Sequence, residues 1–264
     1  MKACSFSAWQ IAGLRSGIAA LVILYAIPNS RRGWSKTTWW VGASYAVTLL
    51  SYIAANKLTT AANAIFLQST APLYVLASSS LLLGERPTRR DITAAAIIAA
   101  GMAIICVGKT APLSTAPHPV QGNWLGLVSG LTWAITIIGL RHLGRAKDGG
   151  GTGAGVVAGN ILTLGFAMLF GWPFENGTTT DWLWIAYLGL GQVGLAYVFV
   201  TRATPHVPAV QIALILMIEP TLNPVIAWLV HDEVPSPSSL VGGASILCAV
   251  ALQTGGRRTD AARR

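Results

Sequence analysis

The sequence predicts an all-α polytopic membrane protein of about nine transmembrane helices, arranged as inverted repeats of four and five helices. Only 10% of its 264 residues are charged and 53% are hydrophobic, whereas soluble globular domains have about 25% charged residues. Its apolar runs are roughly 17 to 24 residues long and apolar on all sides, and about 20 such residues cross a bilayer core as a helix. A weak internal repeat is the third observation.

Nine apolar runs give the expected spans, and the connections between them are short and rich in proline, glycine and serine. We divide the chain into a first half of four helices (1–108), an external connecting loop (109–122), and a second half of five helices that ends in a short basic cytoplasmic tail (123–264). The expected spans are roughly 6–27, 38–56, 62–83, 92–108, 123–140, 154–172, 182–201, 207–230 and 237–253.

The distribution of lysine and arginine predicts the orientation of the chain. Fourteen of the 18 basic residues lie in alternate connections or in the C-terminal tail, and three lie on the opposite side. Because cytoplasmic loops carry the excess of lysine and arginine, we expect a multi-pass protein of the inner (plasma) membrane with its N-terminus outside and its C-terminus in the cytoplasm. The formal charge of +9 therefore indicates juxtamembrane anchors, since no helix has the basic face of a nucleic-acid-binding protein.

The internal repeat relates two proline-containing spans. A shift of 148 positions superposes Pro72 on Pro220 and Glu85 on Glu233. The shift carries the third expected span onto the eighth, five spans later, so the two copies cross the membrane in opposite directions. The later copy lacks the arginines of the first, as the charge bias of an external turn requires. Inverted repeats are typical of secondary transporters, whose site lies near the midplane where the repeats meet.

Five short motifs follow one another along nearly the whole chain: Leu14-Arg15, Ala61-Ala62-Asn63, Pro72, Leu83-Gly84-Glu85-Arg86 and Glu219-Pro220. In their order and spacing they make the chain resemble the drug/metabolite transporter superfamily, and within it the EamA-type members. The resemblance implies ten helices in two inverted five-helix halves. No apolar run before residue 6 partners the 123–140 span, so the helix expected to be missing is the first.

Glu219 is the sharpest candidate for a functional group, because a charged side chain near the bilayer centre costs roughly 2.5–3.5 kcal/mol. It lies well inside its expected span, next to Pro220, with Asn223 and Pro224 following. Two prolines four residues apart remove backbone donors and kink the helix. We expect Glu219 to face a cavity, where it binds a cationic or amine group or carries the coupling proton. The alternative is a neutral, hydrogen-bonded glutamate that secures the kink.

Arg15 is the second candidate, because it lies inside the first expected span. Three roles are open: an ion pair with Glu219, binding of an anionic substrate group, or snorkelling of the side chain to the interface. Other polar groups within spans either contact the substrate or join helices by hydrogen bonds, and Asn160 and Gln192 are interpreted as such links. Aromatic residues within spans are expected to line a cavity. The further site candidates are Gln68, Asn223, Tyr52, Tyr197, Tyr74, Trp133 and Asn63.

The remaining motifs predict neither a dinucleotide-binding site, nor a metal site, nor an enzyme. The run from Gly189 to Gly194 fits GxGxxG, but it lies within a span with no strand before it, so we interpret it as a helix-packing surface. The three cysteines and four histidines are scattered without metal-ligand spacing, so neither a metal nor a cofactor is predicted. The chain contains no GxSxG or HExxH motif and is not expected to be an enzyme.

The predicted function is secondary active transport of a small metabolite or drug-like solute by alternating access, as a proton-coupled exporter. The expected partners are the lipid bilayer, the solute and protons, without nucleic acid. A second hypothesis is an inactive, partner-dependent or regulatory membrane protein, as a missing first helix would give, and an intramembrane enzyme is a weaker third. Amino acids, nucleobases, drugs and sugar derivatives fit the candidate residues equally well, and the oligomeric state is left open.

Overall fold

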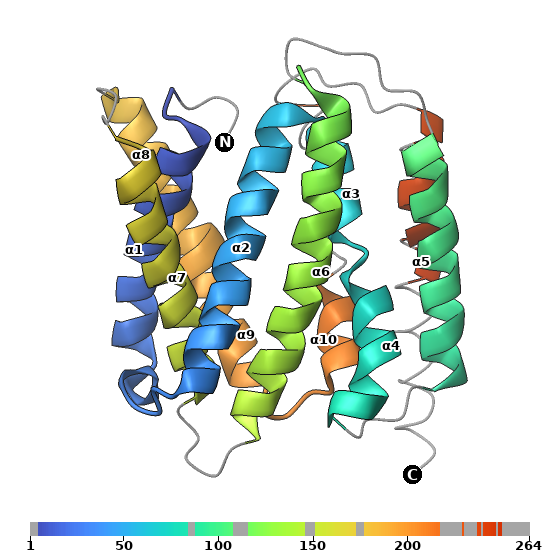
Figure 1. The fold of residues 1–264 in the computed structure, drawn as a ribbon, viewed down its shortest axis with the longest axis horizontal. Helices are drawn as coiled ribbons and strands as arrows, with labels where there is room; N and C mark the ends of the chain where they lie inside the picture. Colours follow the sequence, from blue (N-terminus) through green and yellow to red (C-terminus); the bar gives the residue numbers. More distant parts are fainter. Residues whose placement is uncertain are drawn as a thin grey trace. The chain divides into compact units, whose positions relative to one another are not determined.

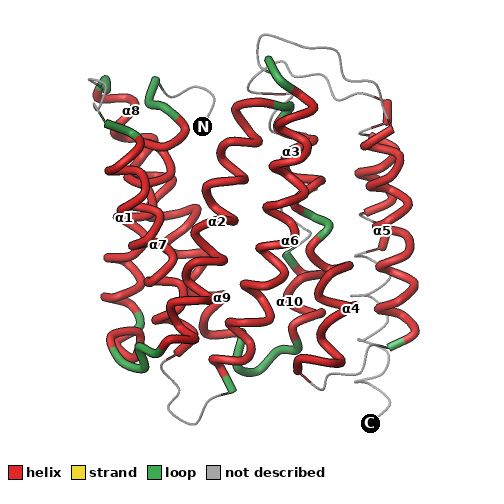
Figure 2. The backbone as a smooth tube through the Cα atoms, in the orientation of Figure 1, coloured by secondary structure: helices red, strands yellow, loops and turns green. Residues whose placement is uncertain are grey.

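The computed structural model describes residues 5–83, 88–107, 116–145, 151–172, 177–216, 229, 237–238, 240–246 and 248–249. The regular structure in these ranges is helical, and they contain no strand (Figure 2). Figure 1 labels the helices from α1 to α10 in chain order. The all-α fold that the sequence predicts is confirmed for this part of the chain.

The helices group into two compact units, and each unit combines segments from both halves of the sequence. The first unit contains Met1–Ala54 and Ile135–Val207, and the second contains Ala55–Ala134 and Pro208–Arg264. Helices α2 (Lys36–Leu58) and α6 (Pro119–Gly144) contribute to both units. The division of the sequence into a half of four helices and a half of five stays a prediction.

The first unit is built around the N-terminal helix α1 (Ala8–Ala26), which packs against α7 (Gly151–Phe170). Helix α1 also packs against three consecutive elements, α8 (Thr179–Tyr187), the π-helix η2 (Leu188–Leu195) and α9 (Ala196–Ala203). Figure 1 shows α1, α7 and α8 side by side. A 3-10 turn, η1 (Pro28–Arg31), follows α1 and leads toward α2.

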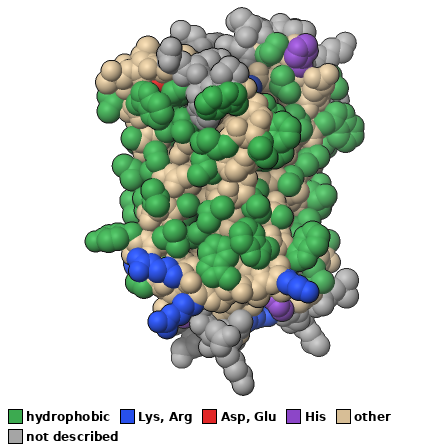
Figure 3. All heavy atoms as spheres, turned by 60° about the vertical axis from the view of Figure 1, so that its left-hand side comes forward, with side chains coloured by type: hydrophobic (Ala, Val, Ile, Leu, Met, Phe, Trp, Pro, Cys, Tyr) green, Lys and Arg blue, Asp and Glu red, His purple; other side chains and the backbone are tan. Residues whose placement is uncertain are grey.

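Four of the described helices are long and apolar enough to cross a membrane: α1, α6, α7 and the composite helix Thr179–Ala203. Tryptophans near the starts of α2, α6 and α8 are exposed, as expected of an interfacial belt. On the face drawn in Figure 3, hydrophobic side chains are spread over the middle, and lysine and arginine lie toward the lower end. The exposed tryptophans are Trp39, Trp40, Trp124, Trp182 and Trp184.

Two glycines of α1 allow its close approach to α7. A Cβ atom at Gly13 would lie 2.2 Å from the Cβ of Ala167, and one at Gly17 would lie 3.3 Å from the Cδ2 of Leu164. Small residues at such crossings let two helix backbones pack in van der Waals contact. The spacing of Gly13 and Gly17 therefore provides a surface for close helix packing.

Capping bonds fix the starts of α1 and α8. Ser7 caps α1 in a capping box with Gln10, and Thr178 caps α8 in a capping box with Asp181. Asp181 also joins the two helices, because its carboxylate accepts hydrogen bonds from the backbone N–H and the hydroxyl of Ser5, at 3.0 and 2.7 Å. The two capping boxes satisfy amide donors that a helix start leaves unpaired. The two bonds from Ser5 to Asp181 hold the start of α1 beside α8.

The second unit contains the remaining helices. Helix α4 packs against α5 and α10, and α3 also contacts α5. Gly126 of α6 faces α3, since a Cβ atom there would lie 2.9 Å from the Cβ of Leu67. The bounds of these helices are Ala61–Gln68 for α3, Ala71–Leu83 for α4, Arg89–Val107 for α5 and Ala209–Ile215 for α10.

A break divides the expected span 62–83 into α3 and α4. Pro72 has no N–H to donate to the carbonyl of Gln68, four residues earlier, so α-helical bonding cannot continue through this point. The N–H of Thr70 donates instead to the Leu67 carbonyl, at 3.2 Å. The sequence predicts one proline-containing helix here, and the structure differs by this interruption ahead of the proline.

Candidate functional site

The first unit places a buried arginine near the middle of α1. The Arg15 side chain is only 2% exposed, so it stays inside the unit and does not snorkel to the interface. Its Nη1 atom donates a hydrogen bond to the Oε1 atom of Gln192 at 3.2 Å. A guanidinium stays charged in proteins and has five N–H donors. The structure therefore keeps a permanent positive charge deep within an apolar helix.

Gln192 reaches Arg15 from the π-helix η2. π-helical turns are rare and are frequent at functional sites. A glycine allows η2 to lie against α1, since a Cβ atom at Gly189 would lie 2.7 Å from the Cβ of Ile18 and 3.0 Å from the Arg15 carbonyl oxygen. The GxGxxG match is thus a helix-packing surface, as predicted from the sequence. The same surface carries the side chain that binds Arg15.

Two tyrosines from different helices lie beside this charge. Tyr45 of α2 and Tyr197 of α9 form an edge-to-face pair, with ring centroids 4.9 Å apart and ring planes at 62°. Tyr45 is fully buried, and its side chain interacts electrostatically with Arg15 and Asn160 as well as with Tyr197. Edge-to-face pairs contribute about 0.5–1.5 kcal/mol beyond the area they bury. The aromatic pair and the charge are parts of one polar cluster.

The Arg15 cluster is defined as Arg15, Tyr45, Asn160, Gln192 and Tyr197. Arg15, Tyr45, Asn160 and Gln192 each lie near the middle of a helix or of the composite helix Thr179–Ala203, the depth at which secondary transporters bind their substrates. Tyr197 lies five residues after Gln192 on the composite helix. Gln192 is exposed and Tyr197 is half-buried, whereas the other three side chains are buried. One positive charge is thus surrounded by amides and tyrosines. This arrangement suits a solute that has an anionic group and an aromatic or apolar part.

The second unit holds other predicted residues along α3 and α6. The Nε2 of Gln68 donates to the Oγ of Ser129 at 2.9 Å, and the Nδ2 of Asn63 donates to the Oδ1 of Asn123 at 3.4 Å. The hydroxyl of Thr59 donates to the same Asn123 oxygen at 2.9 Å. These bonds fit the role of joining helices that is the alternative to substrate contact at such positions.

The structure brings part of the predicted site together. Arg15 and Tyr197 share the Arg15 cluster, and Tyr52 lies two turns after Tyr45 on the same face of α2. Gln192, interpreted as a link between helices, does join η2 to α1. The other predicted residues lie elsewhere: Gln68, Asn63, Tyr74 and Trp133 belong to the second unit, while Glu219 and Asn223 lie outside the described residues.

Sequence reasoning missed Tyr45. A Cβ atom at Gly159 would lie 2.3 Å from the Cδ1 of Tyr45 and 2.8 Å from the Gly42 carbonyl oxygen. The tyrosine ring therefore lies where α2 and α7 approach most closely at a pair of glycines. The spacing of seven residues between Tyr45 and Tyr52 was the available signal. Within the described ranges, no group of three or more His, Cys, Asp or Glu side chains is placed to hold a metal ion.

Comparison with known proteins gives the family. The description "EamA-like transporter family" belongs to the family whose pattern matches residues 1–107 and 120–255 of this chain. The chain belongs to this family. The resemblance carried by the sequence motifs is thereby confirmed, and this EamA-type chain is an all-α polytopic membrane protein of a transporter family.

Individual proteins similar to this EamA-type chain are also transporters by name. It is 28% identical over 204 residues to an uncharacterized transporter from Archaeoglobus fulgidus, over 77% of this chain and 71% of the relative. It is 25% identical over 201 residues to the aromatic amino acid exporter YddG from Ancylobacter novellus, over 75% of this chain and 67% of the relative. A solved crystal structure shares its fold with a TM-score of 0.72 and 20% identity, covering 97% of this chain and 90% of that chain.

Proposed function

We propose that this EamA-type protein is a secondary active transporter of the plasma membrane that exports a small solute in exchange for protons. Its two sequence halves, related by an inverted repeat, act by alternating access around a site at mid-depth. The inverted proline-containing spans and the names of its relatives support this proposal. The residues of the Arg15 cluster support a proposal for the chemical class of the solute.

The buried contact of Arg15 with Gln192 is the observation that carries the proposal. Ionisable groups within a membrane are costly, and they typically mark substrate or ion pathways. We assign to Arg15 the binding of an anionic group, because the planar guanidinium donates two parallel hydrogen bonds to a carboxylate. The solute carboxylate binds the guanidinium while the bond to Gln192 holds the Arg15 side chain in position. Because Gln192 is exposed, it forms the accessible edge of the cluster.

The pair formed by Tyr45 and Tyr197 offers a surface to the rest of the solute. Aromatic rings prefer edge-to-face or offset contacts with other rings, and Tyr197 keeps part of its side chain accessible. One relative is named an aromatic amino acid exporter. Aromatic amino acids are therefore the first solutes to test, and other small carboxylates with an apolar part come next.

The test uses proteoliposomes loaded with labelled phenylalanine, tyrosine or tryptophan, with and without an imposed proton gradient. We expect a proton gradient to stimulate efflux. The variant Arg15→Gln should reduce efflux about tenfold or more, because it loses charge-assisted hydrogen bonds of about 1.5–3 kcal/mol. Arg15→Lys should retain an intermediate rate, since lysine keeps the charge but not the fork of donors.

Arg89→Gln is the matched control, because Arg89 is an exposed arginine at the start of α5 in the second unit. Its efflux should equal that of the unchanged protein. Absence of flux for the aromatic amino acids and for a panel of small carboxylates would contradict the proposed function. An efflux rate that is unchanged in Arg15→Gln would show that the protein transports the solute without binding it through Arg15.

A further inference from the structure

Two arginines, Arg31 and Arg202, bind the C-terminal end of α1. The Nε of Arg31, in η1, donates to the carbonyl oxygen of Leu24 at 3.0 Å. The Nη2 of Arg202, in α9, donates to the carbonyl oxygen of Ala26 at 3.3 Å. These carbonyls belong to the last turn of α1, where helices leave acceptors unpaired and carry a partial negative charge. Both arginines are exposed residues, yet both are held by the end of the same helix.

The carbonyl groups of Leu24 and Ala26 place both guanidinium groups at the C-terminal end of α1. Leu24 and Ala26 are two residues apart, which separates their oxygens by about 3 Å along the axis and by less than about 5 Å across the helix. Within the described part of the chain, each arginine side chain makes this one hydrogen bond. Since a guanidinium has five N–H donors, four remain on each side chain. Two such groups at the end of one helix suit a phosphate, whose oxygens accept several charge-assisted bonds.

An exposed apolar strip lies next to the arginines along α1 and α9. Leu21 and Tyr25 of α1 are 69% and 84% exposed, and Phe199 of α9 is 62% exposed. Leu21 and Tyr25 are four residues apart and share a face of α1, while Phe199 lies one turn before Arg202 on α9. Helices α1 and α9 are in contact. These exposed side chains offer an apolar surface to an acyl chain whose headgroup reaches the arginines.

The charge at this end of the first unit is positive. Arg32 and Lys36 follow Arg31 closely, and both are exposed. Among the described residues, the carboxylates are those of Asp91, in the second unit, and Asp181. Asp181 is bonded at the other end of α1, a helix of 19 residues and so about 28 Å in length. An anionic headgroup at the two arginines therefore meets no described carboxylate.

We propose that Arg31 and Arg202 bind the phosphate of an anionic phospholipid whose acyl chain packs along Leu21, Tyr25 and Phe199. The cytoplasmic leaflet supplies such lipids and attracts lysine and arginine next to the membrane. The distribution of basic residues assigns this end of α1 to that leaflet. The site is distinct from the Arg15 cluster, which lies at mid-depth. Two competing explanations are that the arginines only cap α1, or that all basic residues attract lipid equally.

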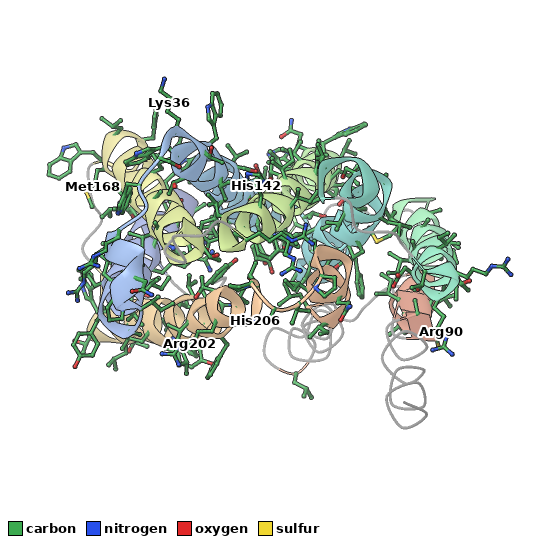
Figure 4. The ribbon with its side chains drawn as sticks, turned by 90° about the horizontal axis from the view of Figure 1, so that it is seen from below. Lys36, Arg90, His142, Met168, Arg202 and His206 are labelled. Carbon is green, nitrogen blue, oxygen red and sulfur yellow. The ribbon has the colours of Figure 1, made fainter. Side chains whose placement is uncertain are left out.

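The experiment measures lipid binding to the purified full chain by native mass spectrometry during titration with phosphatidylglycerol or with phosphatidylcholine of the same acyl chains. The double variant Arg31→Gln/Arg202→Gln removes the site. The control Arg32→Gln/Lys36→Gln removes the same charge from the same end. Figure 4 shows Lys36 and Arg202 on opposite sides of the first unit, so Lys36→Gln acts away from Arg202.

We expect the unchanged protein to prefer phosphatidylglycerol, and the Arg31→Gln/Arg202→Gln variant to bind it about a hundredfold more weakly, the factor that the loss of two charge-assisted hydrogen bonds implies. The control should lose less, at most about thirtyfold, which is the diffuse attraction of two basic residues near a membrane surface. Equal losses in the two double variants would overturn the proposal in favour of diffuse charge attraction. Unchanged binding of phosphatidylglycerol by the Arg31→Gln/Arg202→Gln variant would show that the two arginines only cap α1. If that variant gives no folded monomer, Arg31→Gln and Arg202→Gln alone should each weaken binding about tenfold, the factor for one charge-assisted hydrogen bond.

Discussion

Arg15 of α1 and Gln192 of η2 are joined by a hydrogen bond of 3.2 Å from Nη1 to Oε1, and the Gln192 amide reaches this position from a π-helix of eight residues. Because π-helical bonding links residues five apart, Gly189 and Gly194 both come to face α1. The close approach of the two helices then brings the amide within reach of the guanidinium. Gln192 therefore acts as a positioning residue for Arg15 in the proposed transport reaction.

Substitutions of Gln192 should separate positioning from charge. Gln192→Leu removes the acceptor and should raise the KM for solute about tenfold, as expected from the loss of a hydrogen bond to a charged group. Gln192→Glu places a permanent carboxylate at Arg15 and should abolish transport by competing with the solute. Concentration-dependent efflux from proteoliposomes measures both effects. Transport by Gln192→Glu at the unchanged rate would show that the solute does not bind Arg15.

Gly191→Ala provides the control within the same π-helix. A Cβ atom there would meet only the ring of Tyr187, at 3.8 and 3.9 Å, which is ordinary van der Waals contact. This variant should fold and transport as the unchanged protein does. A large effect of Gly191→Ala would mean that η2 is sensitive to any substitution, so the Gln192 result would then reflect distortion of the helix.

The crossing of α2 and α7 predicts a stability difference between two glycines of one helix. Gly159→Ala introduces a methyl group 2.3 Å from the Tyr45 ring and 2.8 Å from the Gly42 carbonyl oxygen, and such overpacking typically costs 1–3 kcal/mol. Gly165→Ala introduces one where nothing lies within 4 Å, and alanine is favoured over glycine in a helix by about 0.5–1 kcal/mol. Thermal unfolding in detergent should therefore show a lower midpoint for Gly159→Ala and an unchanged or higher one for Gly165→Ala.

Pro72 should be required for the break ahead of α4. Pro72→Ala supplies an N–H that can bond the Gln68 carbonyl, which favours a continuous helix through Ser69 and Thr70. We expect normal folded yield and a transport rate lowered severalfold, because broken helices supply the sites and hinges of secondary transporters. Pro119→Ala is the control, since Pro119 is the first residue of α6 and proline is well tolerated there. Equal rates for both variants and the unchanged protein would make the break structural only.

The helices and their glycine contacts could be predicted from the sequence, because long apolar runs and small-residue spacing act locally. Gly13 and Gly17, four residues apart in the sequence, both face α7. The π-helix could not be predicted, because its alternative backbone bonding depends on the fit of Gly189 and Gly194 against α1. The break before Pro72 could not be located from the sequence, because the position at which α-helical hydrogen bonding stops depends on neighbouring groups such as Thr70.

The candidate site was partly predictable for a related reason. Arg15 stands out because a charge within an apolar run needs an explanation. Tyr45 does not stand out, because an aromatic residue in an apolar helix is more often lipid-facing or core than functional. Its pairing with Tyr197 is a tertiary contact between α2 and α9, and no local pattern encodes it. The polarity of Asn160 is likewise visible in sequence, but its bond to the Val156 carbonyl of its own helix is not.

The predicted orientation can be tested with single cysteines in a chain whose three natural cysteines are replaced. Asn29→Cys lies at an exposed position in the arginine-rich connection after α1, and His118→Cys lies at an exposed position before α6. A membrane-impermeant maleimide should label His118→Cys in intact cells and should label Asn29→Cys only after lysis. The reverse pattern would invert the orientation, and labelling of both in intact cells would place the first and the fourth connections on one side.

Glu219 is the proposed proton carrier, although it lies outside the described residues. Protonation of this carboxylate on one side of the membrane and release of the proton on the other would couple proton entry to solute export. Glu219→Gln mimics the protonated form and should abolish efflux driven by a proton gradient, while exchange of labelled for unlabelled solute without a gradient continues. Proteoliposomes measure both modes in one preparation. If gradient-driven efflux persisted in Glu219→Gln, another group would have to carry the proton; if both modes were lost with normal folded yield, Glu219 would instead belong to solute binding.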